Sequence, residues 1–343
     1  MLTNNWRRSS VKKTRDFHLT LAVSLCACLA LGLASLVFGA AGLSPAQVLQ
    51  GLLAGPESGV AGTIVWYARL PRTAATILCG CALAVSGCVI QGVLGNHLAS
   101  PGIIGVNAGA GLAVTILCAA GVISGWAIAA GSFLGALGAA LLVTLTARRV
   151  GASRSTVILG GVAVNSFLGA ISETVTSLVP DAAALSVDFR IGGFSALPVG
   201  RVQPAGVLIL FSLMLIFTMH NELDLLTLGE ETAQGLGMQV KKVRSILLIL
   251  AALLAGASVA LAGLLGFVGL IVPHMARFLV GSQNKYLLPT AAALGAGLVT
   301  LCDLLGRLIA APYELSAGIF MALIGGPFFL FLLLKGKGGR RYG

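Results

Sequence analysis

The segment TAATILCGCALAVSGCVIQGVL, residues 73–94, contains no acidic or basic side chain. A helix of about 20 mostly apolar residues is long enough to cross the hydrocarbon core of a bilayer. About ten segments of this kind can be distinguished: 17–43, 73–94, 102–123, 126–147, 155–179, 204–219, 245–265, 266–280, 287–305 and 316–334. The eighth is short and contains Pro273. The sequence therefore predicts an all-α polytopic membrane protein with about ten transmembrane helices.

The composition of the chain agrees with this fold class. Of its 343 residues, 57% are hydrophobic and 10% are charged, whereas about 25% of the residues of a soluble domain are charged. No Pro- or Ser-rich linker divides the chain, so we expect a single transmembrane domain over residues 1–343. The basic residues before residue 17 resemble the start of a signal peptide. Because the apolar run after them is long and has no clear A-x-A site, we expect a retained span.

The distribution of Lys and Arg predicts how the spans are oriented. If the N-terminus is cytoplasmic and every span crosses, sixteen basic residues fall inside and five outside, and Arg277 lies within the eighth span. We therefore expect the N-terminal segment 1–16, the loop 221–244 and the tail 335–343 to be cytoplasmic. The net charge of +11 then reflects topology and contact with anionic membrane lipid. No basic face of a soluble domain suggests binding of nucleic acid.

Several kinds of chemistry lack their characteristic motifs. All seven cysteines fall within apolar spans, where Cys is ordinarily a small packing residue, so we expect no metal site and no cofactor. The chain has no G-x-x-x-x-G-K-[ST] motif, so we do not expect it to hydrolyse ATP itself. Neither G-x-S-x-G nor H-E-x-x-H occurs, which argues against an intramembrane enzyme.

Glycine recurs at helical spacing in two stretches: Gly131, Gly135 and Gly138, and Gly263, Gly266 and Gly269. Such spacing lets transmembrane helices approach closely, so we expect a tightly packed bundle. The segments CGCALAVSG (79–87) and AGASVALAG (255–263) share two glycines separated by six residues. The predicted topology gives their helices opposite directions. This favours an inverted repeat, which is common in transporters.

Four segments in order along the chain carry a family resemblance. They are YARLPRTAATILCGCALAVSGCVIQGVLGNHLASPGIIGVNAG (67–109), LTLGEETAQGLGMQVKKVR (226–244), VALAGLLGFVGLIVPHMARFLVG (259–281) and ELSAGIFMALIGGPFFLFLLLKGK (314–337). They resemble the Arg-Leu-Pro-Arg segment with the second helix, the cytoplasmic loop and the late helices of type II ABC importer permeases. Those permeases import iron-siderophores, haem and vitamin B12. The resemblance covers nearly the whole chain.

The resemblance implies an assembly in the cytoplasmic (inner) membrane of a bacterium. Its partners would be a second permease copy, two ABC ATPase subunits on the cytoplasmic side and one extracytoplasmic substrate-binding protein. Each subunit would have ten helices and a short re-entrant helix near the outer mouth, at IGGFSALPVG (191–200). Arg190 and Arg201 flank that stretch and would either attract an anionic chelate or lie among lipid headgroups. The residues do not choose among a siderophore, haem and cobalamin.

Two positions depart from the family pattern. His97 stands where the family has Pro, in the Asn-Pro-Leu-Ala loop near the inner gate. Because Pro restricts the residue before it, the geometry of that loop is expected to differ. Residues 314–318 lack the Pro that precedes the last helix in the family. Ser316 can serve there as an N-cap instead.

The polar segment NELDLLTLGEETAQGLGMQVKKVR, residues 221–244, contains four acids, three bases and three glycines. Residues 223–228 and 230–236 each suit a short helix, with a division at Gly229. From the residues alone the segment is equally a coupling element or a solvated connecting loop. By the resemblance it forms coupling helices that dock on the ATPase subunits. The residues assigned to this role are Leu228, Gly229, Glu230, Glu231, Ala233, Gly235, Leu236 and Gly237.

Three arginines on the predicted outer side are exceptions to the positive-inside bias. Arg69 and Arg72 precede the second span, and Arg307 follows the ninth. By the resemblance they meet carboxylates on the two lobes of the binding protein. A guanidinium suits this role because it binds a carboxylate through two hydrogen bonds and stays charged. The alternative is anchoring at lipid headgroups.

Polar residues within or beside the spans are candidates for the pathway and its gate. The resemblance places Asn96, His97 and Leu98 near the inner gate. A carboxylate at membrane depth is costly, so Glu173 in the fifth span either lines the pathway or is packed, protonated or paired, between helices. Asn165 on the same span either faces the pathway or joins helices by hydrogen bonding.

An ion-coupled secondary transporter of a small organic solute is the main alternative. Such a carrier needs a relay of carboxylate or imidazole groups within the membrane. We expect Glu173 to be the only acid deep within a span, which speaks against a relay. Co-purification with an ATPase would distinguish the two functions.

Overall fold

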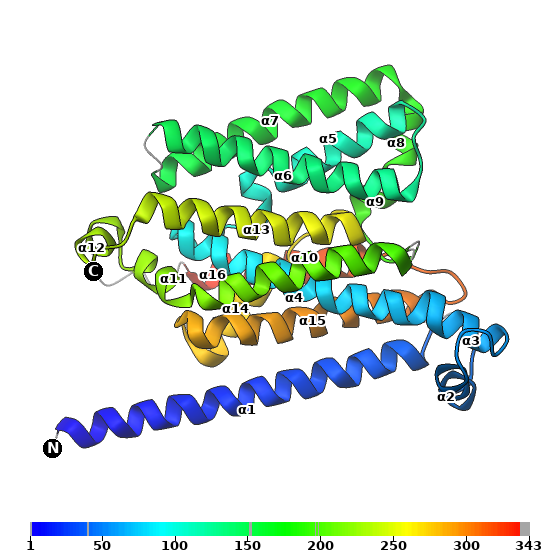
Figure 1. The fold of residues 1–343 in the computed structure, drawn as a ribbon, viewed down its shortest axis with the longest axis horizontal. Helices are drawn as coiled ribbons and strands as arrows, with labels where there is room; N and C mark the ends of the chain where they lie inside the picture. The colour runs from blue at the N-terminus through cyan, green and yellow to red at the C-terminus, as the bar shows by residue number, and fades with distance from the viewer. Residues whose placement is uncertain (1, 40, 151–152, 196, 198, 337–343) are drawn as a thin grey trace.

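The computed structural model describes residues 2–39, 41–150, 153–195, 197 and 199–336, and every regular element in these ranges is helical (Figure 1). Of the predicted tail 335–343, residues 337–343 lie outside the described part. The elements are α1 Leu2–Val37, α2 Pro45–Ala54, α3 Val60–Ile64, the π-helical turn η1 Val65–Arg69, α4 Leu70–Leu94, the 3-10 turn η2 Pro101–Ile104, α5 Val106–Ala119, α6 Gly125–Val150, α7 Arg154–Leu178, α8 Pro180–Leu185, α9 Val187–Ile191, α10 Val199–Thr218, α11 His220–Thr227, α12 Glu230–Gly235, α13 Val240–Ala262, α14 Val268–Val280, α15 Asn284–Ile309 and α16 Ala317–Gly336.

Seven helices in the described ranges are long and apolar enough to cross a membrane. They are Phe17–Val37, Val60–Leu94, Gly125–Val150, Arg154–Leu178, Gly200–Thr218, Val240–Ala262 and Asn284–Ile309. The other three predicted spans correspond to the shorter apolar helices α5, α14 and α16. The all-α membrane fold is therefore confirmed, and the number of ten crossings stays a prediction. The second span is longer than predicted, because α3, η1 and α4 form one continuous helical stretch of 35 residues.

Two helices form the centre of the bundle. In the apolar windows of Val60–Leu94 and of α13, 78% of the residues are buried, compared with 11% in α7. α4 packs against α10, α13, α14 and α15, and α13 also packs against α6. α5, α6 and α7 lie together on one side, and α1 lies on the other side along α15 (Figure 1). A helix that is apolar all round is typical of an interior, whereas α7 keeps a long uncovered face.

The two ends of the bundle carry different elements (Figure 1). α11 and α12 lie at the end where α1 begins, called here the α12 end, and α2, α3, α8 and α9 lie at the opposite end, called the α2 end. This arrangement agrees with the predicted topology, which separates the loop 221–244 from Arg69 and Arg72. The short helices at the predicted outer mouth are α8 and α9. They directly precede the stretch 191–200, whose residues 192–195 are not helical.

Close packing in the bundle depends on backbone contacts at a few glycines. A Cβ added to Gly80 on α4 would clash with the carbonyl of Gly295 on α15, and the reverse also holds. Gly135 on α6 is pressed in the same way against Gly109 on α5. Of the glycines that the spacing singled out, Gly138 has nothing within 4 Å of an added Cβ. Helical spacing thus identifies the class of contact, and only the fold shows which glycine makes it.

Gly80→Ala should destabilise the bundle by about 1–3 kcal/mol, because the methyl group must displace backbone rather than a mobile side chain. The measurement is the melting temperature of the detergent-solubilised protein. Gly138→Ala is the matched control, since its methyl group enters open space. Equal melting temperatures for the two variants would contradict the assigned contact.

Candidate functional site

The segment 221–244 folds as two short helices joined by a sharp turn. α11 and α12 flank Gly229, which has φ 109°, and α12 is followed by Gly237, which has φ 86°. These values are accessible to glycine and strained for other residues. The expected division at Gly229 therefore has a backbone cause. Gly235 differs, since it is the last helical residue of α12 and has open space beside it.

Polar contacts fix α11 to the transmembrane helices. Oδ1 of Asp224 accepts hydrogen bonds from the backbone N (3.0 Å) and Nδ2 (2.6 Å) of Asn284, the first residue of α15. Nη2 of Arg154, the first residue of α7, donates to the carbonyl oxygen of Leu226 at 2.5 Å. That carbonyl belongs to the last turn of α11, where backbone acceptors have no partner within the helix. The helix is thereby joined to both α15 and α7.

Two further contacts complete the attachment. Nη2 of the buried Arg244 on α13 lies 3.1 Å from Oε2 of Glu230, which begins α12. Leu223 of α11 is fully buried and packs against Gly92 of α4. Isolated helices of this length are unstable in water. These contacts therefore determine where the two short helices lie.

The outer face of the segment combines apolar and acidic side chains. Leu228 and Leu236 are 61% and 64% exposed, and Glu231 in the first turn of α12 is exposed as well. Ala233 is fully buried and belongs to the core instead. Of the residues assigned to coupling, Ala233 and Glu230 thus hold the helix in place. Leu228, Leu236 and Glu231 are the exposed side chains of the set that a partner can reach, beside the exposed backbone of Gly235 and Gly237.

A polar network fixes the predicted gate loop after α4. The side chain of Asn96 closes the turn, since its Oδ1 accepts a hydrogen bond from the backbone N of Leu98 at 2.9 Å. The exposed ring of His97 meets the ring of His274 edge-on, with centroids 6.2 Å apart. The ring is nevertheless partly desolvated by its neighbours, and this lowers the pKa of His97 below its usual value. The charge of Arg277 and the nearby His274 lower it further. The imidazole at the position where the family has Pro therefore holds a proton less readily than a free imidazole does.

Gln91 was not singled out by the sequence, although it anchors this loop. Its Nε2 donates to the carbonyl oxygens of Ala99 and Gly269, both at 3.1 Å. Its Oε1 accepts from Nη1 of Arg277 at 2.6 Å. The feature of the sequence that could have identified Gln91 is an amide side chain within an otherwise apolar span. Such side chains commonly hydrogen-bond across transmembrane helices.

The two candidates on α7 have different surroundings. Nδ2 of Asn165 donates to the carbonyl oxygen of Gly102 at 2.9 Å, so it joins α7 to η2. Glu173 is exposed, on the same uncovered helix as the exposed Leu159 and Phe167. Lipid is an unfavourable environment for a carboxylate. The uncovered face of α7 therefore suits a second subunit or an aqueous pathway better than lipid alone.

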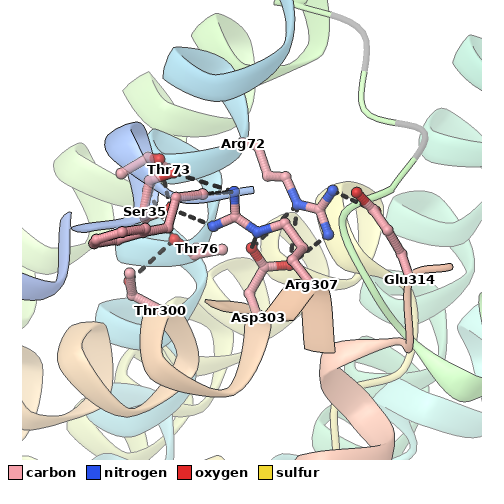
Figure 2. A network of polar contacts seen from close by, with 9 residues as sticks. Ser35, Arg72, Thr73, Thr76, Thr300, Asp303, Arg307 and Glu314 are labelled. Atoms are coloured by element: carbon pink, nitrogen blue, oxygen red, sulfur yellow. Dashed lines mark hydrogen bonds and ion pairs between the residues drawn. The ribbon is translucent and has the colours of Figure 1, made fainter. Parts of the chain in front are cut away.

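The arginines assigned to docking lie close together with two acids, and the group is called here the arginine cluster: Arg69, Arg72, Arg307, Asp303 and Glu314. Figure 2 shows Arg72 and Arg307 with the two acids. Nε of Arg72 lies 3.1 Å from both carboxylate oxygens of Asp303, and its Nη2 lies 2.9 Å from Oδ1. Nη1 of Arg72 donates to Oε2 of Glu314 at 2.7 Å. Nε of Arg307 lies 3.2 Å from Oδ2 of Asp303.

Arg69 and Arg307 also hold the end of α1. Nη1 of Arg69 donates to the carbonyl oxygens of Leu36 (2.7 Å) and Val37 (2.6 Å). Arg307 donates to the carbonyl oxygen of Ser35 at 3.1 Å through Nη1 and to its hydroxyl at 2.6 Å through Nη2. The last carbonyls of a helix need outside donors, and cations are favoured there. Two arginines from other helices thus complete the C-terminus of α1.

The burial of the cluster bears on two expectations from the sequence: anchoring of the arginines at lipid headgroups, and Glu173 as the only acid deep within a span. Arg69 and Arg307 are only 5% and 3% exposed, so neither side chain extends to lipid headgroups. Asp303 is 1% exposed and lies in the predicted ninth span. The expectation that Glu173 is the only acid deep within a span is therefore wrong. Asp303 stands in the sequence of that span, two residues before its predicted end, and its pairing with two arginines becomes visible only in the fold.

Two cavities adjoin the cluster at the α2 end. One, of about 370 Å³, is lined by Arg69, Arg72, Arg307 and Glu314 among others. The other, of about 430 Å³, is lined by residues that include Asp188, Arg201 and Glu314. Glu314 therefore lies on the wall that both cavities share. Arg190 lies outside both linings and contacts Thr115 and Ser172 through Nη2, at 3.3 and 3.4 Å.

Comparison with known proteins gives a consistent result. The chain is 35% identical to the hemin transport system permease protein HmuU of Yersinia pestis, over 78% of this chain and 82% of that protein. It is 36% identical to the Fe(3+)-citrate import system permease protein YfmE of Bacillus subtilis, over 95% and 98%. A solved structure described as an inward-facing metal-chelate type ABC transporter covers 92% of this chain and 98% of its own, with 27% identity and a TM-score of 0.82.

The sequence profile of the FecCD transport family matches residues 27–335, from the middle of α1 to the end of α16. The match includes the α11–α12 segment, the gate loop and the arginine cluster. The chain belongs to the FecCD transport family.

Proposed function

We propose that the chain is the membrane-spanning permease subunit of an ATP-driven, binding-protein-dependent importer. The observation that carries this proposal is the α11–α12 segment, which is held by α4, α7, α13 and α15 and exposes Leu228 and Leu236. An ATP-driven permease without a P-loop motif of its own must receive work from another subunit. An apolar and acidic surface on rigidly attached helices is suited to that transfer. ATP hydrolysis is then the task of a separate ATPase.

The substrate class follows from the relatives. HmuU and YfmE are permeases for hemin and for ferric citrate, respectively. We propose an iron chelate (a siderophore or haem) or cobalamin as the substrate of this chain. A proton-coupled carrier is less well supported, because the deeply buried Asp303 is paired with two arginines rather than poised to exchange a proton.

The proposed assembly uses three surfaces of the chain. The uncovered face of α7 would meet a second permease copy and border the pathway. The α11–α12 segment would bind one of two ATPase subunits, and the α12 end and both termini would then lie in the bacterial cytoplasm. The arginine cluster at the α2 end would receive a carboxylate of one extracytoplasmic binding protein. Gln91 and the loop of Asn96, His97 and Leu98 would form part of the inner gate.

The first test is reconstitution. The permease, purified from cells that co-express its ATPase and binding protein, should retain the ATPase and support ATP-dependent uptake into vesicles. Uptake should cease when the binding protein or ATP is omitted. Uptake driven by an ion gradient without ATP would contradict the proposal. Radiolabelled ferric citrate, ferric hydroxamate, haem and cobalamin are the substrates to compare.

Gly229→Ala should lower transport relative to ATP hydrolysis, because the positive φ adds about 1–3 kcal/mol of backbone strain at the turn between α11 and α12. We measure uptake per ATP hydrolysed in vesicles. Gly235→Ala is the control, since that helical position accepts a Cβ without a clash. Equal ratios for the two variants would remove the turn from the coupling path.

Glu173→Cys should react with a membrane-impermeant maleimide in the assembled transporter, because a carboxylate on the uncovered face of α7 is expected beside water or a polar partner. The reaction is followed in a background without the native cysteines, of which Cys26 is exposed. The cysteine-free parent measures background labelling. Labelling by a lipid-soluble maleimide alone, in every nucleotide state, would place Glu173 in lipid.

A further inference from the structure

Arg72 divides its hydrogen bonds between two acids that differ in burial. Nε and Nη2 bind Asp303, whose side chain is 1% exposed, and Nη1 binds Glu314, whose side chain is 28% exposed (Figure 2). Asp303 lies within α15, whereas Glu314 lies in the connection between α15 and α16. One partner of Arg72 is therefore fixed in the core. The other is on a loop that reaches the surface of a cavity.

The charges of the cluster do not balance. Arg72 and Arg307 are paired with the two carboxylates, whereas Arg69 binds backbone carbonyls of α1. All three arginines together with Glu314 line the cavity of about 370 Å³. The cavity floor thus carries an excess positive charge while Glu314 is present, and a larger one without it. A carboxylate from outside is the group that this floor would accept. Arginine binds such a group through paired hydrogen bonds.

Glu314 has space to leave Arg72. It also lines the neighbouring cavity of about 430 Å³, together with Arg201 and Ser316. A side chain that moves from one cavity wall to the other stays among polar groups. When Glu314 leaves, Arg72 keeps Asp303, but its Nη1 loses the hydrogen-bond acceptor that Glu314 supplied. An unsatisfied donor at a partly buried position costs free energy. An exchange of carboxylates avoids that cost.

We propose that Glu314 is an internal substitute for a carboxylate of the docking partner, and that docking displaces it from Nη1 of Arg72. This inference rests on the proposed docking of a binding protein at the arginine cluster. Glu314 and a carboxylate of the binding protein would then compete for the guanidinium of Arg72. The contact therefore weakens docking and lets the partner leave after delivery.

The test measures docking of the proposed binding-protein partner to the nanodisc-reconstituted permease–ATPase complex, by surface plasmon resonance. Glu314→Gln removes the charge at constant size and should tighten binding about two- to fivefold, the range of an exposed ion pair. Glu314→Ala should tighten it at least as much. Arg72→Ala should weaken binding. Melting temperatures of all variants show whether the bundle remains folded.

Glu57 supplies the matched control. It is exposed at the α2 end and has no ion pair with any residue in the described ranges. Glu57→Gln removes the same charge without freeing an arginine, so it should leave affinity unchanged in 0.5 M salt, where long-range attraction is screened. The gain from Glu314→Gln should persist at that salt concentration, because it comes from a direct contact.

The outcomes separate the two proposals. If Arg72→Ala weakens docking and Glu314→Gln leaves it unchanged or weaker, the displacement is wrong and the docking site stands. A gain from Glu314→Gln that disappears in 0.5 M salt, or that Glu57→Gln matches, also overturns the displacement. If Arg72→Ala has no effect in a folded complex, the docking site itself is wrong, and the displacement fails with it.

Discussion

The α2 end of the molecule depends on the ion pairs that the carboxylate of Asp303 makes with two arginines. Asp303 is almost fully buried and binds both Arg72 and Arg307, so it joins α4 to α15 and neutralises charge in a low-dielectric interior. With Arg307 held, its guanidinium can donate to the last turn of α1. With Arg72 held, its Nη1 lies at the cavity, where it binds Glu314. Helix packing and a charged surface thus arise from a single buried acid.

The opposite end of the bundle is organised by a different constraint. Short helices outside the membrane gain little from their own hydrogen bonds, so they must be fixed by tertiary contacts. α11 and α12 receive such contacts from Asn284, Arg154 and Arg244, which belong to three different membrane helices. A displacement of the segment is consequently resisted by α15, α7 and α13 together. The rigidity needed to move a bundle comes from this distribution of contacts.

The sequence predicted the membrane fold and the family well, because both follow from local patterns. The uncharged run 73–94 is the central helix α4, and the loop motif at 226–244 is the α11–α12 segment. Pairings between distant residues could not be predicted. Arg72 and Asp303 are 231 positions apart, and their burial appears only when α4 meets α15. The difference between two glycines of one polar loop could not be predicted either: Gly229 has a positive φ, whereas Gly235 is the last helical residue of α12.

The capped end of α1 limits how far the chain can be shortened. α1 is peripheral, and only 22% of its apolar window is buried, so by area alone it would seem removable from a minimal transporter. Its carbonyls are, however, the acceptors for Arg69 and Arg307. Deleting the helix would remove the acceptors of the buried Arg69 and leave Arg307 with Asp303 alone, a defect that the loss of apolar contacts would not create. The smallest functional form of this permease therefore has to keep its first helix.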